Sequence, residues 1–139
     1  MTARTVVTPL SLVKDSSVAQ GSSFTVDAVN GNVILAPGPW KILLVVTNGD
    51  SSSHTCTIRA TGNGVNAAGS SQTSPAPSNT VFTQSTLGDL VVTVTNGTTR
   101  IIGPFTLDRY AQTDGSMSID WSASTSMTAW AYLLPYNAI

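Results

Sequence analysis

The chain has 139 residues, of which 9% are charged, and its formal net charge is −1. An average soluble domain is about 25% charged, so this surface must be polar mainly through hydroxyl and amide groups. The near-neutral balance excludes the electrostatic footprint of a protein that binds nucleic acid or an anionic membrane, and the single cysteine, Cys56, excludes an intrachain disulfide framework. The length predicts one domain, and the absence of Glu predicts little helix.

Residues 1–23 predict an extended N-terminal arm. Short apolar stretches alternate there with Pro9, Ser and Thr, a pattern that suits an extended segment better than a core strand. Because such arms often reach a neighbouring molecule, we expect partner contacts from the apolar residues Val6, Val7, Leu10, Leu12 and Val13. The segment lacks the positive and long apolar regions of a secretory signal peptide, so we expect synthesis in the cytoplasm.

Residues 24–139 predict a single β-domain punctuated by turns. The run 40–47 is apolar on both faces and predicts a central strand, and the alternating run 54–60 predicts its hairpin partner. Hairpins are also favoured by the dipeptides that tolerate a positive φ, namely Asn30-Gly31, Asn48-Gly49, Asn63-Gly64, Asn96-Gly97 and Asp114-Gly115.

The middle of the chain holds a long loop and a second predicted hairpin. Residues 62–80 have no periodic apolar pattern and are dense in Gly, Ser, Pro and Asn, which predicts a long surface loop. Residues 87–95 and 99–107 flank an Asn-Gly turn and predict paired strands, with Gly103-Pro104 interrupting the ladder. Val-Thr-Asn-Gly occurs twice, and both an internal repeat and chance explain it.

Two further strands complete the predicted fold. Residues 116–122 alternate strictly, which predicts one buried and one exposed face, whereas 127–134 is expected to be covered on both faces. About eight short strands in all predict an all-β protein. We expect an antiparallel β-sandwich or barrel, of jelly-roll or β-tulip-like type, with a long loop at 62–80 and the extended N-terminal arm.

Few residues offer catalytic chemistry. His54 and Cys56 share one strand face, and a buried thiol beside a half-exposed imidazole explains them better than a Cys-His dyad, since nothing nearby suggests an oxyanion hole. Asp108, Asp114 and Asp120 are scattered, and solvated turn residues explain them better than a surface calcium site does. We therefore expect no enzyme, no cofactor and no metal.

Two other patterns have competing interpretations. Trp40, Trp121 and Trp130 could stack against sugars or bases, although a β-core needs such side chains in any case. Asn96-Gly97-Thr98 satisfies the glycosylation sequon, but without an export signal a hairpin turn is the preferred interpretation.

One ordered series of motifs supports a family resemblance. It comprises Ile-Ile-Gly-Pro-Phe at 101–105, Tyr110, the Asp-Gly turn at 114–115, the short strand 116–122, and a final strand rich in Thr and Ala. In this order the motifs resemble those of head decoration (cement) proteins of tailed bacteriophages, of the kind common in phages of actinobacteria. The residues that fit this series are 45–50 and 90–134.

The resemblance implies a β-sandwich or β-tulip module on the outer surface of the virion. Such a module binds the assembled lattice of the major capsid protein, often as a homotrimer, and clamps neighbouring subunits without a reaction or cofactor. The loop at 62–80 departs from the family pattern, which puts the details of contact and oligomeric state in question. Two alternatives stay open: a carbohydrate- or receptor-binding β-module that uses an exposed Trp, and a tail or neck component.

Overall fold

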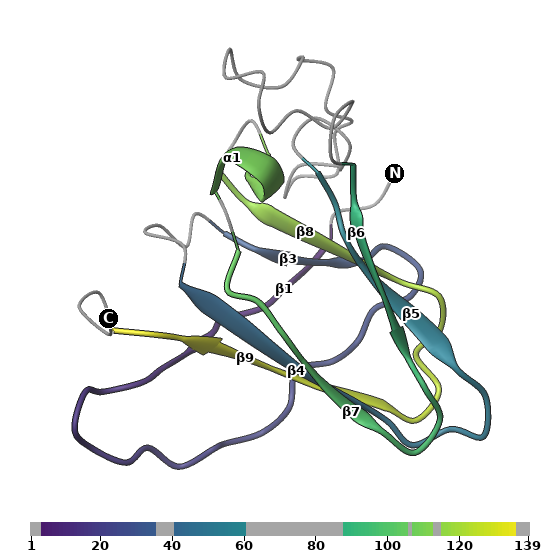
Figure 1. Ribbon diagram of the computed structural model, residues 1–139, viewed down its shortest axis with the longest axis horizontal. Coiled ribbons are helices and arrows are strands. Elements are labelled where there is room, and N and C mark those ends of the chain that lie inside the picture. The colour runs from purple at the N-terminus through teal and green to yellow at the C-terminus, as the bar shows by residue number, and fades with distance from the viewer. Residues whose placement is uncertain (1–3, 36–40, 61–87, 106, 113–114, 136–139) are drawn as a thin grey trace.

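The computed structural model describes residues 4–35, 41–60, 88–105, 107–112 and 115–135. These residues form two β-sheets and one short helix, α1 (Leu107–Tyr110), so the prediction of an all-β protein with little helix is confirmed (Figure 1). The loop predicted at 62–80 lies outside the described residues, as does Trp40.

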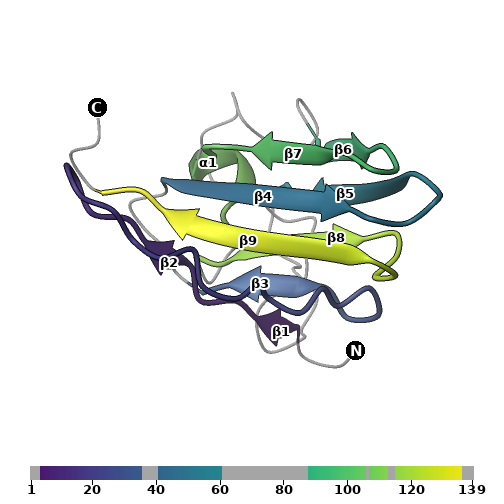
Figure 2. The same cartoon turned by 90° about the horizontal axis from the view of Figure 1, so that it is seen from below.

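The strands divide between a five-stranded and a four-stranded sheet. The five-stranded sheet has the order β1-β3-β8-β5-β6, with β1 (Thr5–Val6), β3 (Asn32–Ile34), β8 (Met117–Trp121), β5 (His54–Ile58) and β6 (Leu90–Val94). The four-stranded sheet has the order β2-β9-β4-β7, with β2 (Leu10–Ser11), β9 (Met127–Leu133), β4 (Ile42–Asn48) and β7 (Thr99–Ile102). In Figure 2 the four-stranded sheet lies in front of the other.

Strand pairing is antiparallel in the centre of both sheets and parallel at one edge of each. β4 pairs antiparallel with β7 and β9, and β8 pairs antiparallel with β3 and β5. β1 pairs with β3, and β2 with β9, in parallel. The expectation of purely antiparallel sheets therefore needs correction. The N-terminal segment joins each sheet as an added edge strand, and only strands joined by a hairpin must be antiparallel.

The short connections join strands of different sheets. β4 continues into β5, β6 into β7 and β8 into β9, and the two strands of each pair belong to different sheets. The predicted hairpins around Asn48-Gly49 and Asn96-Gly97 are therefore wrong. A two-residue turn requires its flanking strands to pair, whereas these longer connections can cross the distance of about 10 Å between packed sheets.

One hydrophobic core draws on both sheets. Strand β4 alternates fully buried with half-buried residues and lies between β9 and β7, which agrees with the central strand predicted at 40–47. The large side chains that this core buries almost completely are Ile34, Ile42, Leu44, Val46, Ile58, Met117 and Ile119. Cys56 also belongs to the core.

Strand β8 differs from its prediction on one face. Met117, Ile119 and Trp121 are buried as the alternation predicts. The opposite face was expected to be exposed, yet Ser118 is fully buried and has an interaction partner. Alternation marks the apolar face reliably, but a small hydroxyl side chain can be buried on the other face when a partner satisfies it.

Candidate functional site

The N-terminal segment is held by the edges of both sheets. The amide of Thr5 donates to the carbonyl of Gly31 over 3.0 Å, and that of Val7 donates to Val33 over 2.8 Å. Farther along, the amide of Leu12 donates to the carbonyl of Leu133 over 2.8 Å. The segment therefore crosses from the five-stranded sheet to the four-stranded sheet within a few residues.

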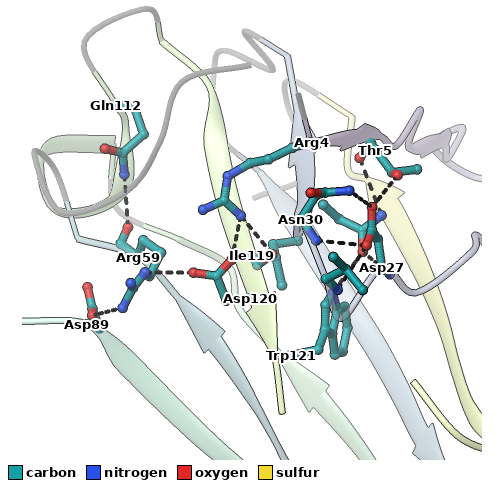
Figure 3. A network of polar contacts seen from close by, with 12 residues as sticks. Arg4, Thr5, Asp27, Asn30, Arg59, Asp89, Gln112, Ile119, Asp120 and Trp121 are labelled. Carbon is teal, nitrogen blue, oxygen red and sulfur yellow. Dashed lines mark hydrogen bonds and ion pairs between the residues drawn. The ribbon is translucent and has the colours of Figure 1, made fainter. Parts of the chain in front are cut away.

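Arg4 anchors the start of this segment in a network of charged groups (Figure 3). Its side chain is 3% exposed, and Nη1 lies 2.6 Å from Oδ1 of Asp120 and donates to the carbonyl of Ile119 over 3.2 Å. Arg59 reaches the same carboxylate from β5, with Nε 2.8 Å from Oδ2 of Asp120, and it also contacts Asp89 over 2.8 Å. Such a chain of partly buried charges favours one arrangement of the strands, because breaking it leaves a charge without a partner.

A turn before β3 completes the network. Asp27 accepts hydrogen bonds from the amides of Val29 and Asn30 and from the Thr5 hydroxyl. These bonds, the one from the Asn30 amide foremost, hold the pKa of Asp27 below its ordinary value of 3.8. Gly31 follows with φ +82° beside the Arg4–Asp120 pair, where a Cβ atom would lie 2.8 Å from the carbonyl oxygen of Ile119. Only glycine fits this position.

A second polar centre lies where β4 and β6 end and their connections to the other sheet begin. Asn48 is fully buried, and its Nδ2 donates to the carbonyls of Ser52 and Val94, each over 2.8 Å. Its Oδ1 accepts from the amide of Asp50 over 2.9 Å. The backbone carbonyl of Asn48 accepts from Gly97, which belongs to the connection between β6 and β7. The side chain of Asn48 thus ties the connection after β4 to the end of β6, and its backbone carbonyl holds the connection after β6.

The structure gives the two residues of the candidate dyad, His54 and Cys56, different surroundings. His54 Nε2 lies 2.7 Å from Oδ2 of Asp50, so the imidazole has a carboxylate partner in its own connection. Cys56 is fully buried, and this burial raises the pKa of its thiol to about 12. A thiol with that pKa forms almost no thiolate at neutral pH and is a poor nucleophile. The interpretation of Cys56 as a small buried core residue fits this environment.

Of the acidic residues considered for calcium, the structure describes the side chain of Asp120. Asp120 is engaged by two arginines, Asp114 lies outside the described residues, and of Asp108 only the backbone within α1 is described. In the described part of the chain no three His, Cys, Asp or Glu side chains gather as metal ligands would. No helix among those residues is long and apolar enough to cross a membrane.

The residues predicted for partner contact differ in exposure. Val6 is 53% exposed and Val13 is 59% exposed, so both are accessible. Leu10 and Leu12 are half-buried, and Val7 is 3% exposed because it packs into the core of its own chain. The accessible apolar part of the arm is therefore narrower than the sequence indicates.

A further apolar surface lies on the outer side of the four-stranded sheet. Register aligns Ile101 of β7, Val45 of β4 and Trp130 of β9 in one row across the strands. The neighbouring row holds Leu43 and Tyr132, and Leu10 of β2 continues it. Ile101 is 71% exposed and the others are half-buried. We call the surface of Leu10, Leu43, Val45, Ile101, Trp130 and Tyr132 the apolar face.

We did not predict the apolar face from the sequence, although two predicted strands indicate such a surface. The run 40–47 is apolar on both faces, and for 127–134 we expected both faces to be covered. Of the tryptophans considered for stacking, Trp121 is buried and donates to Asn32 over 2.8 Å, whereas Trp130 lies on this face. Comparison of the chain with protein-family models, curated proteins and solved structures gives no match.

Proposed function

We propose that this chain is a non-catalytic structural protein that decorates and stabilises the outer surface of a tailed-phage head by binding the major capsid protein lattice. In this proposal the two sheets form a closed sandwich of jelly-roll or β-tulip-like type, and the protein assembles as a homotrimer on the virion. It is made in the host cytoplasm and needs no cofactor, nucleic acid or membrane.

The observation that carries the proposal is the way the N-terminal segment is built. Arg4 and Val7 fix it on the body of the protein, whereas Val6 and Val13 point apolar side chains outward. An exposed apolar side chain on a rigid backbone binds a partner at a low entropic cost, because little conformational freedom is lost on contact. The resemblance of 101–134 to decoration proteins supplies the kind of partner.

The test is co-sedimentation of the purified chain with phage heads produced without the gene for this chain. We expect the wild-type chain to saturate the heads, and the double variant Val6→Asp/Val13→Asp to bind at least about tenfold more weakly, because two contact side chains become charged. Val29→Asp is the matched control, since Val29 is 90% exposed and lies outside the predicted arm. A wild-type chain that does not sediment with heads would contradict the proposal.

A second candidate function is supported by the aromatic pair on β9. Trp130 and Tyr132 lie two residues apart on the same face of the strand, and the Tyr132 hydroxyl accepts from Nε2 of Gln20 over 2.9 Å. Aromatic faces beside amide groups are a common surface for sugar binding. If wild type binds on a glycan array and Trp130→Ala does not, a carbohydrate- or receptor-binding module is favoured.

Location of the protein on phage tails instead of heads would favour a tail or neck component.

A further inference from the structure

The apolar face lies outside the hydrophobic core of the chain. Its residues point away from the core, because their neighbours along β4 and β9, such as Leu44 and Ala129, are the ones that fill the core. The largest exposed fraction on this face belongs to Ile101, at 71%. Isolated apolar residues on a surface are ordinary, but a contiguous set spanning four strands indicates an interaction surface.

The charge of the face limits the chemistry of its partner. The outward positions of β2, β4, β7 and β9 carry no charged side chain, and besides the apolar face they hold Thr47, Thr99 and Thr128. The hydroxyls of Thr47 and Thr99 interact with each other over 2.8 Å. An uncharged face of this kind fits an uncharged, largely apolar patch, because a charged patch would lose its water without gaining a counter-charge.

The area of the apolar face indicates whether its partner is a second copy of this chain or a larger assembly. Strands β4 and β9 hold three outward positions each, β7 holds two and β2 holds one. With strands about 4.8 Å apart and outward positions about 6.7 Å apart, these positions cover roughly 300 Å². A stable complex of standard size buries about 800 Å² on each partner. The face alone is therefore too small for a stable dimer in solution, and it fits a larger assembly that contacts other surfaces of the chain as well.

We infer that the apolar face docks on an uncharged apolar patch of the capsid lattice, beside the contacts made by the N-terminal segment. This inference rests on the proposed function and names the surface that the proposed function leaves open. Leu10 links the two surfaces, because it belongs to the N-terminal segment and lies in register with Tyr132 of the face. Docking therefore covers a surface that continues from the apolar face into β2 of the N-terminal segment.

The test compares two exposed edge-strand residues on opposite sheets. Ile101 of β7 belongs to the face, whereas Val91 of β6 is 59% exposed on the five-stranded sheet and serves as the matched control. Ile101→Asp should weaken binding to heads by at least about tenfold, since it introduces a charge into an apolar contact. Val91→Asp should bind as wild type does. A gentler variant, Val45→Thr, keeps the side-chain shape and should weaken binding in the same direction.

The outcomes separate the inference from the proposed function. If wild type binds heads and Ile101→Asp binds equally well, the inference is wrong while the proposed function stands. If wild type itself does not bind, the proposed function fails and the inference fails with it. Sedimentation velocity should show a monomer–oligomer distribution that is unchanged by Ile101→Asp. Loss of an oligomer in this variant would assign the face to a second copy and overturn the inference.

Discussion

The two lateral edges of the protein are completed by different means. On one side the N-terminal segment supplies the last strand of each sheet, β1 and β2, and its residues Arg4 and Val7 are buried. On the other side β6 and β7 end the sheets among the described strands, and Val91 and Ile101 there are largely exposed. We refer to these as the closed side and the open side.

The difference shows how the fold limits unwanted strand pairing. An unpaired edge strand can recruit a strand from another chain, and proteins oppose this with a covering segment or an inward charge. The closed side uses its own chain as the cover. On the open side Arg100 of β7 lies in register with Val46, a core residue, so its side chain starts from the core-facing side of the edge. A strand added there would have to desolvate the guanidinium.

Gly31→Ala should have the largest effect and should act on the closed side. Gly31 has φ +82°, and an added Cβ would meet Nη1 of Arg4 and lie 2.8 Å from the carbonyl oxygen of Ile119. Backbone strain together with displacement of the Arg4–Asp120 pair should lower the free energy of unfolding by about 3–4 kcal/mol. Urea unfolding measures this difference.

The open side offers a matched control at Gly97. Gly97 has φ +74°, yet an added Cβ would find no atom within 4 Å. Gly97→Ala should therefore show backbone strain alone, about 1 kcal/mol. Equal losses for the two variants would mean that the close packing around Arg4 does not contribute to the stability of the closed side.

Asn48→Ala should have the next largest effect and tests the connections between the sheets. The substitution leaves the carbonyls of Ser52 and Val94 and the amide of Asp50 without the partner they have now. We expect a loss of about 2 kcal/mol in the free energy of unfolding, because buried groups lose hydrogen bonds. Asn96 occupies the same place in the second Val-Thr-Asn-Gly sequence but is exposed, so Asn96→Ala should change stability by less than about 0.5 kcal/mol. Similar losses for both would support an internal repeat.

The strands could be predicted from sequence because their signal is local. Alternation identified the core faces of 54–60 and 116–122, and the apolar run 40–47 correctly indicated a central strand. The partners of those strands depend on distant residues. Nothing near Asn48-Gly49 in the sequence shows that β4 is followed by a strand of the other sheet, because the hydrogen bond that fixes this path ends on Val94.

The candidate site was less accessible to sequence reasoning for a related reason. The predicted contact residues of the arm are all apolar, yet Val7 is buried and Val6 is exposed. The parallel pairing of β1 with β3 decides which side of the segment faces inward. The apolar face arises only when β7, β4 and β9 align, which brings Ile101 and Trp130 to either side of Val45. Arg4 gave no local signal at all, since its partner Asp120 lies on β8.

The smallest expected effect is on the pH dependence of stability and compares Asp27 on the closed side with Asp50 in the connection between β4 and β5, the inner neighbours of the open edge. Hydrogen bonds lower the pKa of both carboxyls from 3.8, with the Asn30 amide the main cause at Asp27 and His54 the main cause at Asp50. A carboxyl whose pKa is lower in the folded state stabilises the fold above its unfolded value, near 3.8, and that contribution is lost as the pH falls through the folded pKa.

Asp27→Asn should therefore lose less stability than wild type when the pH is lowered from 7 through the region below about 4. Asp50→Asn should change this acid dependence less, because the carboxyl of Asp50 accepts from one backbone amide, that of Ser51, whereas the carboxyl of Asp27 accepts from two. Urea midpoints measured at several pH values for the three proteins give the comparison. An acid dependence that is changed more by Asp50→Asn than by Asp27→Asn would mean that the carboxyl in the turn beside Thr5 stabilises the fold at neutral pH less than the carboxyl in the connection between β4 and β5 does.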